Sequence, residues 1–312
     1  MVWQENIMKN KIIVILGPTS SGKTGLAVKL AYKFNGEIIG ADSRQVYKGM
    51  DIGTGKDLDE YNYKSKNIPY HLIDVVKPMT KFDLAKYQKL ATRAIENVLK
   101  RGKLPIVVGG TGLYLESIVN NYNLSSAKPD EKLRQKLEKL STQDLFKKIE
   151  AINPDFAKKI NNSDRKNKRR LIRYIEIVAA GENITKPGKS SSSYDFLILG
   201  ITHPRQELKK RIYRRLLERL EKEDMVGEVR RLHNEGVTWK RMENFGLEYK
   251  FISKFLRGRL GYEEMMDKLN IAIRQFAKRQ MTWFRRWEKK IGKIYWIKNY
   301  KEAEIKVKKF IN

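Results

Sequence analysis

The chain has 312 residues, enough for one large domain or two smaller ones with a substantial hydrophobic core. Charged residues make up 32% and apolar residues 41%, and no apolar run is long enough to span a bilayer, so we expect a globular protein outside membranes. No cysteine is present, which excludes disulfides and thiolate zinc sites and fits a cytoplasmic protein. The residues before Lys11 contain no long apolar stretch, so we expect no signal peptide.

The net charge of +29 is the strongest compositional signal. It is unevenly distributed, because residues 1–125 carry +7 and residues 126–312 carry +22. A uniformly lysine-rich proteome would spread the excess evenly along the chain. The concentration of positive charge in the second part therefore favours a nucleic-acid partner or another anionic surface.

The N-terminal part contains a complete phosphate-binding loop. An apolar run at 12–16 predicts a strand, and the spacing of apolar residues at 26–32 predicts a helix. Between them lie the loop residues Gly17, Pro18, Thr19, Ser20, Ser21, Gly22, Lys23 and Thr24. Backbone N–H groups of such a loop bind phosphate oxygens, Lys23 adds a positive charge, and Thr24 offers a hydroxyl to Mg²⁺. The loop alone leaves open which phosphate compound is bound.

Further strands and helices alternate after this loop, which predicts a parallel sheet. The expected strands span 36–42, 70–75, 104–108 and 195–201, and helices are expected at 82–99 and 113–119. Asp42 ends the second strand, where ligands of parallel sheets bind. From position alone it could be a general base, a Mg²⁺ ligand or a turn former, and Asp74 competes for the ligand role. A second glycine turn, Gly109–Gly112, follows the strand at 104–108.

The middle of the chain lacks strand signals. Residues 130–180 show helical spacing, and residues 181–193 are rich in Gly, Ser and Lys and resemble a linker. We therefore expect a helical insertion at 126–193, with a net charge of +8, inside a core formed by 1–125 and 194–312. From residue 205 to about 290 the chain is expected to be helical and basic, and the apolar run at 294–297 is of undetermined type.

Three basic clusters could bind anions. Arg211 and Arg215 lie four residues apart on one helical face, which suits a clamp on diphosphate but also a solvated basic face. Residues 271–287 mix aromatic and basic side chains, and the aromatic ones are expected to be a core stripe. Arg169, Arg170 and Arg173 form the third cluster, which is equally ambiguous.

The order of these motifs resembles one family, the tRNA dimethylallyltransferases (isopentenyltransferases), over most of the chain. The segments that carry the resemblance are the phosphate loop 17–24, ADSRQVYKGMDIGTGK at 41–56, HLID at 71–74, VGGTGLY at 108–114, RRLIR at 169–173 and AKRQMTWFR at 277–285. The resemblance implies an α/β fold, a phosphate-loop NTPase-like parallel sheet core with an all-helical insertion domain. It also implies transfer of a dimethylallyl group from dimethylallyl diphosphate, with Mg²⁺, to the N6 amine of the adenosine 3′ of the anticodon in tRNA.

The resemblance also assigns site residues. It implies that Asp42 is the general base and that Arg215 stabilises the departing diphosphate, with Thr111 also in the catalytic site. The positions that match tRNA contacts of the family are Asp42, Ser43, Arg44, Gln45, Thr111, Arg134, Arg169, Arg170, Leu171, Ile172 and Arg173. One segment departs from the pattern: many members read Ile-Gly-Tyr-Lys where this chain has Phe245-Gly246-Leu247-Glu248.

Three other functions stay open on the sequence. An isopentenyltransferase acting on free adenine nucleotides would not need the helical insertion or the charge of +22. An ATP-dependent small-molecule kinase is favoured only by the phosphate loop, and a non-catalytic RNA-binding protein would leave Asp42 without a purpose. The expected partners are tRNA and dimethylallyl diphosphate, with no membrane partner, and the chain is expected to be a monomer.

Overall fold

The computed structural model describes residues 10–182, 188–189 and 193–312. The chain divides into two compact units, 1–120 with 192–312 and 121–191. The first boundary falls a few residues before the expected position at 126, because Tyr122–Asn123 forms a strand (β7) that pairs inside the smaller unit with Gly188–Lys189 (β8). The rest of the expected linker lies partly outside the described residues. No helix in the described ranges is both long enough and apolar enough to cross a membrane.

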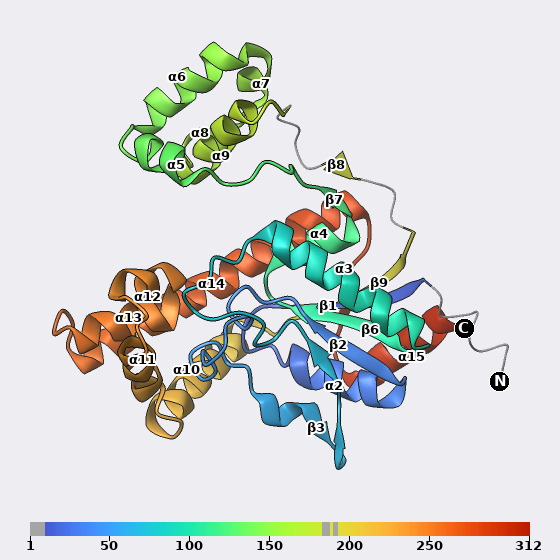
Figure 1. Cartoon of the computed structure of the whole chain (residues 1–312). Coiled ribbons are helices and arrows are strands. Elements are labelled where there is room, and N and C mark those ends of the chain that lie inside the picture. The colour runs from blue at the N-terminus through green and yellow to red at the C-terminus, as the bar shows by residue number, and fades with distance from the viewer. Residues whose placement is uncertain (1–9, 183–187, 190–192) are drawn as a thin grey trace. The chain divides into compact units, whose positions relative to one another are not determined.

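A parallel six-stranded sheet forms the centre of the larger unit within the described chain (Figure 1). Its strand order is β10-β9-β1-β6-β2-β5. The strands are β1 Lys11–Leu16, β2 Gly36–Gly40, β5 Tyr70–His71, β6 Leu104–Gly109, β9 Asp195–Ile201 and β10 Tyr295–Ile297. All the pairings between them are parallel, as the alternation of strands and helices predicts.

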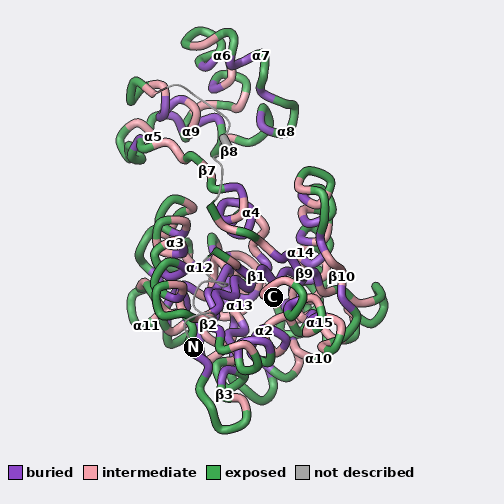
Figure 2. Tube along the Cα trace, turned by 90° about the vertical axis from the view of Figure 1, so that its right-hand side faces the viewer, coloured by how far each residue is buried: buried purple, intermediate pink, exposed green. Residues whose placement is uncertain are grey.

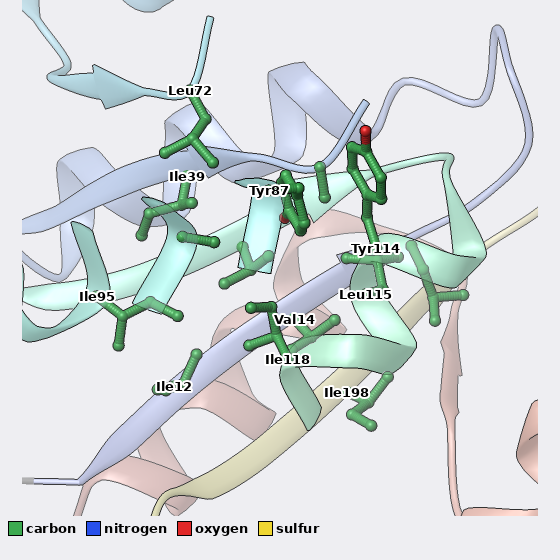
Figure 3. Close-up of a cluster of buried hydrophobic side chains, with 14 of the residues drawn as sticks. Ile12, Val14, Ile39, Leu72, Tyr87, Ile95, Tyr114, Leu115, Ile118 and Ile198 are labelled. Carbon is green, nitrogen blue, oxygen red and sulfur yellow. The ribbon is translucent and has the colours of Figure 1, made fainter. Parts of the chain in front are cut away.

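Helices cover both faces of this sheet, so its central strands are apolar on both sides. On one face, Ile12 and Val14 of β1 pack with α3 (Leu84–Lys100) and α4 (Gly112–Val119). Figure 3 shows this cluster, in which Tyr87 of α3 stacks on Tyr114 of α4 with ring centroids 3.8 Å apart. On the other face, Ile13 and Ile15 pack with α2 (Lys23–Lys33) and α15 (Tyr300–Ile311).

One expected strand is shorter in the structure, and the run of undetermined type near the C-terminus forms a strand. The segment 70–75 forms a strand only at Tyr70–His71, because Leu72 and Asp74 have φ values of 63° and 57°, which are incompatible with extended backbone. The run at 294–297 is an edge strand of the sheet, paired with β9.

A helical layer follows β9, as the basic, helix-patterned sequence predicts. Its helices are α10 Arg205–Glu221, α11 Met225–Asn234, α12 Trp239–Phe245, α13 Leu247–Leu256 and α14 Tyr262–Ile291. Their apolar faces form a core of their own, which also includes Val46, Tyr47 and Met50 from the loop after β2. Figure 2 shows buried residues alternating with exposed ones along these helices. The layer therefore holds the loop after β2 against the sheet edge.

The smaller unit consists mainly of short helices. They are α5 Glu131–Leu137, α6 Thr142–Ile152, α7 Pro154–Lys159, α8 Asn162–Arg165 and α9 Lys168–Ala179. Leu145 and Ile149 of α6 pack against Leu171 and Ile175 of α9 in its core. Ser141, Asn153 and other polar residues cap these helices by accepting backbone N–H groups. The unit is helical as expected, with the β7–β8 ribbon in addition.

A buried carboxylate binds three basic side chains near the amino end of β2, at the sheet edge opposite to the phosphate loop. Glu37 of β2 accepts hydrogen bonds from Lys103 (2.8 Å), His71 (2.7 Å) and Arg101 (2.6 Å). Burial alone would raise the pKa of Glu37, but these partners outweigh it and lower the pKa to about 2. The depressed pKa means that this stabilisation is present above the ordinary glutamate pKa and is lost as the pH falls through about 2.

Replacing Glu37 with glutamine is therefore expected to lower the free energy of unfolding by about 3 kcal/mol at neutral pH. Urea denaturation followed by circular dichroism measures this, and the difference from the wild type should shrink as the pH approaches 2. The control is Glu264→Gln, which removes a half-exposed ion pair with Lys268 and should leave the stability unchanged. Equal effects of the two changes would contradict the expectation.

Candidate active site

Three turns meet at the carboxyl edge of the sheet. The phosphate loop follows β1, Asp42 follows β2, and Thr111 follows β6. Because β6 lies between β1 and β2, the three turns are neighbours in space. They line a cavity of about 910 Å³ together with the loop around Gly55 and residues of the helical layer. This volume is in the range of small-molecule sites.

The phosphate loop has the geometry that its glycines predict. Gly22 adopts φ 83° and is the N-cap of α2, whose first residues are Lys23 and Thr24. The Lys23 ammonium donates to the Pro18 carbonyl at 3.1 Å, across the loop. The loop residues that line the cavity are Thr19, Ser20, Gly22, Lys23 and Thr24. Gly17, Pro18 and Ser21 do not line it, and the Ser21 side chain packs back against Gly17. The helix N-terminus and the Lys23 charge are suited to binding an anion at this loop.

The second glycine turn brings the other two strand ends together. A Cβ atom on Gly109 would lie 2.1 Å from the Ala41 carbonyl oxygen, so only glycine fits this approach of β6 to β2. Directly beyond it, the Thr111 hydroxyl accepts the Ser43 N–H at 3.0 Å. Thr111 therefore fixes the turn that carries Asp42.

Asp42 lines the cavity near Lys23, and its negative charge opposes the lowering of the lysine pKa by burial. One of its carboxylate oxygens accepts the Arg44 N–H at 2.8 Å. This hydrogen bond is typical of an aspartate that forms a turn, so the structure fits the interpretation of Asp42 as a turn former. Because the side chain also lines the cavity, its predicted role as a general base remains compatible with the geometry.

The residues after Asp42 are held by the helical layer and the next loop. Arg44 donates to the Phe245 carbonyl at 2.8 Å, and Gln45 donates to the Gly55 carbonyl at 2.9 Å. Ser43, Arg44 and Gln45 all line the cavity. The structure thus brings together the whole predicted segment from Asp42 to Gln45.

Asp74 does not compete with Asp42 for a metal. It does not line the cavity, and its carboxylate forms an ion pair with the Lys56 ammonium, which is buried and also donates to the Tyr47 carbonyl at 2.7 Å. The interpretation of Asp74 as a strand-end ligand is therefore wrong, because the backbone leaves the strand at Leu72.

Arg211 and Arg215 both reach the cavity from α10. Arg211 donates to the Ser20 carbonyl of the phosphate loop at 2.9 Å. Arg215 donates to the Gly55 carbonyl at 3.1 Å and forms an ion pair with Asp57. Two guanidinium groups at one anion site suit a clamp, and the interpretation as a merely solvated face does not fit these contacts.

Sequence reasoning did not assign a role to Gln280, although it lies in a quoted motif. Its carbonyl accepts the Thr19 N–H at 2.9 Å, and its amide donates to the Gly110 carbonyl at 2.9 Å. Gln280 therefore ties the phosphate loop to the second glycine turn. A glutamine within the otherwise apolar stripe of the helix at 262–291 was the only available signal. In the same helix Trp287 is a core residue, as expected, whereas Phe276 lines the cavity.

Mg²⁺ was predicted to bind at Thr24. No group of three or more acidic or histidine side chains in the described ranges is arranged to hold a metal ion. Mg²⁺ is usually bound by one or two protein ligands together with phosphate oxygens and water. The Thr24 hydroxyl in the cavity next to the anion site fits that pattern, in which the diphosphate supplies the other ligands.

Burial lowers the pKa of Lys23 to about 8, with a contribution from Arg215, although Asp42 opposes the shift. Only the protonated lysine attracts an anion, so diphosphate binding should weaken as the pH rises above about 8. We expect Kd for inorganic diphosphate to rise by up to about tenfold per pH unit there. Calorimetric titration between about pH 7 and pH 10 measures this, and net proton uptake on binding above about pH 8 is the accompanying signature. A Kd that does not change over this range would contradict it.

The predicted tRNA residues of the smaller unit fall into two groups. Arg134 forms a two-point contact with Glu176, at 2.6 Å and 2.9 Å, and Arg173 donates to the Ala127 carbonyl at 2.8 Å. Leu171 and Ile172 are buried in the core of the unit, which leaves only their backbone for any RNA contact.

Two exposed arginines of α9 are better placed for RNA. Arg170 is half exposed and forms an ion pair with Asp164. Arg169 is exposed, and no ion pair of it occurs within the described parts of the chain.

A parallel sheet whose first strand leads into a phosphate loop, with a carboxylate and two arginines facing the same cavity, defines a phosphate-loop α/β protein. Its phosphate-loop site differs from that of an ordinary nucleoside-triphosphate hydrolase, because β6 ends in Gly109 and is followed by Gly110 and Thr111 instead of an acid.

Comparison with known proteins identifies the family. A family model described as IPP transferase matches residues 45–287. The chain is 45% identical over 292 residues to tRNA dimethylallyltransferase 1 of Syntrophus aciditrophicus, covering 93% of this chain and 94% of that protein. It is also similar to the solved tRNA isopentenylpyrophosphate transferase of Bacillus halodurans, with a TM-score of 0.69, 35% identity and coverage of 97% and 95%. A structure of a eukaryotic dimethylallyltransferase acting on tRNA matches with a TM-score of 0.75, 29% identity and coverage of 92% and 73%. The chain belongs to the IPP transferase family.

Proposed function

We propose that this chain transfers the dimethylallyl group of dimethylallyl diphosphate to the N6 amine of the adenosine 3′ of the anticodon in tRNA. The observation that carries the proposal is that Asp42 and the phosphate loop line one cavity. A diphosphate held by the loop places its allylic carbon within the same space as the carboxylate. The names of the relatives support this choice of donor and acceptor.

The chemistry follows from charge and proton movement. The N6 nitrogen attacks the first carbon of the donor while the carbon–oxygen bond breaks, and the bonding electrons leave with the diphosphate. Asp42 accepts the proton that N6 loses as the new carbon–nitrogen bond forms. Lys23 and Arg215 stabilise the negative charge that develops on the leaving oxygen. Mg²⁺ bound at Thr24 would further neutralise the diphosphate.

The target base must leave its stack to reach this cavity. Bases that undergo chemistry are extruded into a protein pocket, and aromatic side chains stabilise the extruded base by stacking. Phe245, Phe251 and Phe276 line the cavity and provide such apolar surface. The positive charge of residues 126–312 would hold the RNA backbone.

One assay separates this function from the alternatives. Purified protein is incubated with radiolabelled dimethylallyl diphosphate, Mg²⁺ and either unmodified tRNA or AMP, and separately with ATP. We expect isopentenyladenosine in tRNA, no prenylated AMP and no ATP turnover. Prenylation of AMP alone would support the nucleotide isopentenyltransferase, ATP turnover would support the kinase, and tRNA binding without any product would support a non-catalytic RNA-binding protein.

Replacing Arg169 with alanine should weaken tRNA binding several-fold, because an exposed arginine that contacts phosphate contributes through counterion release. The slope of log Kd against log salt should fall by about one, measured by filter binding over a range of salt concentrations. The matched control is Lys158→Ala in the same unit, since Lys158 is exposed and only pairs with Asp155. An equal effect of the two changes would show that Arg169 contributes only general charge.

We also propose that the protein acts in the cytoplasm, where tRNA is found, and that it is a monomer. Light scattering coupled to size-exclusion chromatography tests the second proposal, and a mass of about twice 36.6 kDa would contradict it.

A further inference from the structure

The segment that departs from the family pattern has a definite place in the fold. Gly246 is the N-cap of α13, and Glu248 and Tyr249 lie in its first turn, directly after Leu247. Both side chains are buried, although neither is required by the proposed chemistry. The Tyr249 ring packs on the loop Asp51–Gly55, and Glu248 pairs with Arg219, which donates hydrogen bonds to the same loop. This loop forms one wall of the cavity.

One half of the arrangement holds the N–H groups of this loop. Glu228 of α11 is 1% exposed and accepts the N–H groups of Asp51 (2.8 Å), Ile52 (2.7 Å) and Gly53 (3.0 Å). The Tyr249 hydroxyl donates the fourth hydrogen bond to the same carboxylate at 2.7 Å. The Tyr249 ring also packs on Gly53, where a Cβ atom would lie 2.7 Å from the ring.

The other half holds the carbonyl groups of the same turn. Arg219 of α10 donates to the carbonyls of Ile52 (3.1 Å) and Gly53 (3.2 Å). The same guanidinium pairs with Glu248 at 3.2 Å. A lysine at position 248 could not accept a hydrogen bond from Arg219. This half therefore depends on an acidic or amide side chain at position 248.

The loop in turn reaches two cavity residues. The Gly55 carbonyl accepts from Arg215 at 3.1 Å and from Gln45 at 2.9 Å. A shift of this carbonyl would move the Arg215 guanidinium, because the guanidinium donates to it. The guanidinium also lies so close to Gly55 that an added Cβ atom would be 2.4 Å from it.

We propose that Glu228, Tyr249, Arg219 and Glu248 form a positioning clamp on the loop Asp51–Gly55, which orients Arg215 toward the departing diphosphate. The proposal rests on the proposed function for its effect on catalysis. Burying two carboxylates and an arginine is costly, and apolar packing would stabilise the fold as well or better. What the polar groups add is a fixed geometry, because each peptide group of the turn is held by a directed hydrogen bond.

The first test is Glu228→Gln, which keeps the side-chain shape but turns one acceptor oxygen into a donor that faces backbone N–H groups. Three readouts are followed: kcat for prenyl transfer, Kd for inorganic diphosphate, and hydrogen exchange of the amides of residues 51–53. We expect kcat to fall about 10- to 100-fold, the typical cost of a misplaced group. Diphosphate binding should weaken several-fold, exchange should become faster, and Kd for tRNA should stay within about twofold.

The matched control is Glu37→Gln, an equally buried carboxylate at the other end of the sheet. It should lower stability without changing kcat or the exchange of residues 51–53. Two changes at position 248 provide a second comparison. Glu248→Gln keeps an acceptor for Arg219 and should retain most of the kcat, whereas Glu248→Lys should lose kcat and diphosphate affinity as Glu228→Gln does. Should Glu228→Gln fail to fold, Tyr249→Phe removes one hydrogen bond while the ring stays on Gly53.

Faster exchange with unchanged kcat and unchanged diphosphate affinity would overturn the proposal, as would slower catalysis without faster exchange. Diphosphate binding and hydrogen exchange require no RNA. They test the clamp even if the wild-type protein proves unable to prenylate tRNA, which would contradict only the proposed function.

Discussion

Replacing Asp42 with asparagine is expected to lower the rate of prenyl transfer by about 10²- to 10⁴-fold, the usual contribution of a general base. Asparagine keeps the oxygen that accepts the Arg44 N–H, so the turn should stay intact. What is lost is the ability to accept a proton from N6. Single-turnover measurement with saturating donor and tRNA checks the rate, and filter binding should show an unchanged Kd for tRNA.

The control for this change is Asp83→Asn. Asp83 also accepts a backbone N–H, from Lys86 at 2.9 Å, and asparagine caps helices as well as aspartate does. It lies at the start of α3 and does not line the cavity, so transfer should be unaffected. Unchanged transfer in Asp42→Asn would assign Asp42 to turn formation alone.

Replacing Arg215 with alanine is expected to lower kcat by about 10²- to 10³-fold, comparable to the loss of one donor at a developing negative charge. Most of the loss should fall on kcat, because the charge on the leaving oxygen is greatest in the transition state. Diphosphate binding should also weaken, since the product carries the same charge. Steady-state kinetics with varied donor measures both quantities.

Removal of Arg215 also leaves Asp57 without its cation. The double change Arg215→Ala with Asp57→Asn separates this effect, since it should not restore kcat if Arg215 acts on the diphosphate. Lys210→Ala is the control for charge alone, because Lys210 is exposed on the same helix and does not line the cavity. Equal losses in Lys210→Ala and Arg215→Ala would argue for a general electrostatic field at this rim.

Much of the core could be predicted because its signals are local. The run Ile12–Leu16, the loop Gly17–Thr24 and the helix after it are contiguous, and short apolar strands with polar ends fix the type of sheet. The neighbourhood of Asp42 and the phosphate loop follows from the same rule, since both lie at carboxyl ends of parallel strands.

Other parts of the site depend on contacts between distant segments. Gln280 reaches Thr19 and Gly110 only because the helix at 262–291 crosses the sheet edge, and no spacing in the sequence reveals that crossing. The error at Asp74 has a local cause, since the positive φ of Leu72 ends the strand where an apolar pattern continues. The boundary of the smaller unit was displaced because a two-residue ribbon such as β7 carries almost no sequence signal.

The longest helix, α14, belongs to two cores at once. Met265, Leu269 and Ile273 lie in the core of the helical layer, whereas Phe284 and Trp287 lie in the core on one face of the sheet. Separating the helical layer from the sheet would therefore expose the buried apolar residues at one end of α14, or break this helix in the middle. We therefore expect the sheet and the helical layer to move together as one rigid body when a substrate binds.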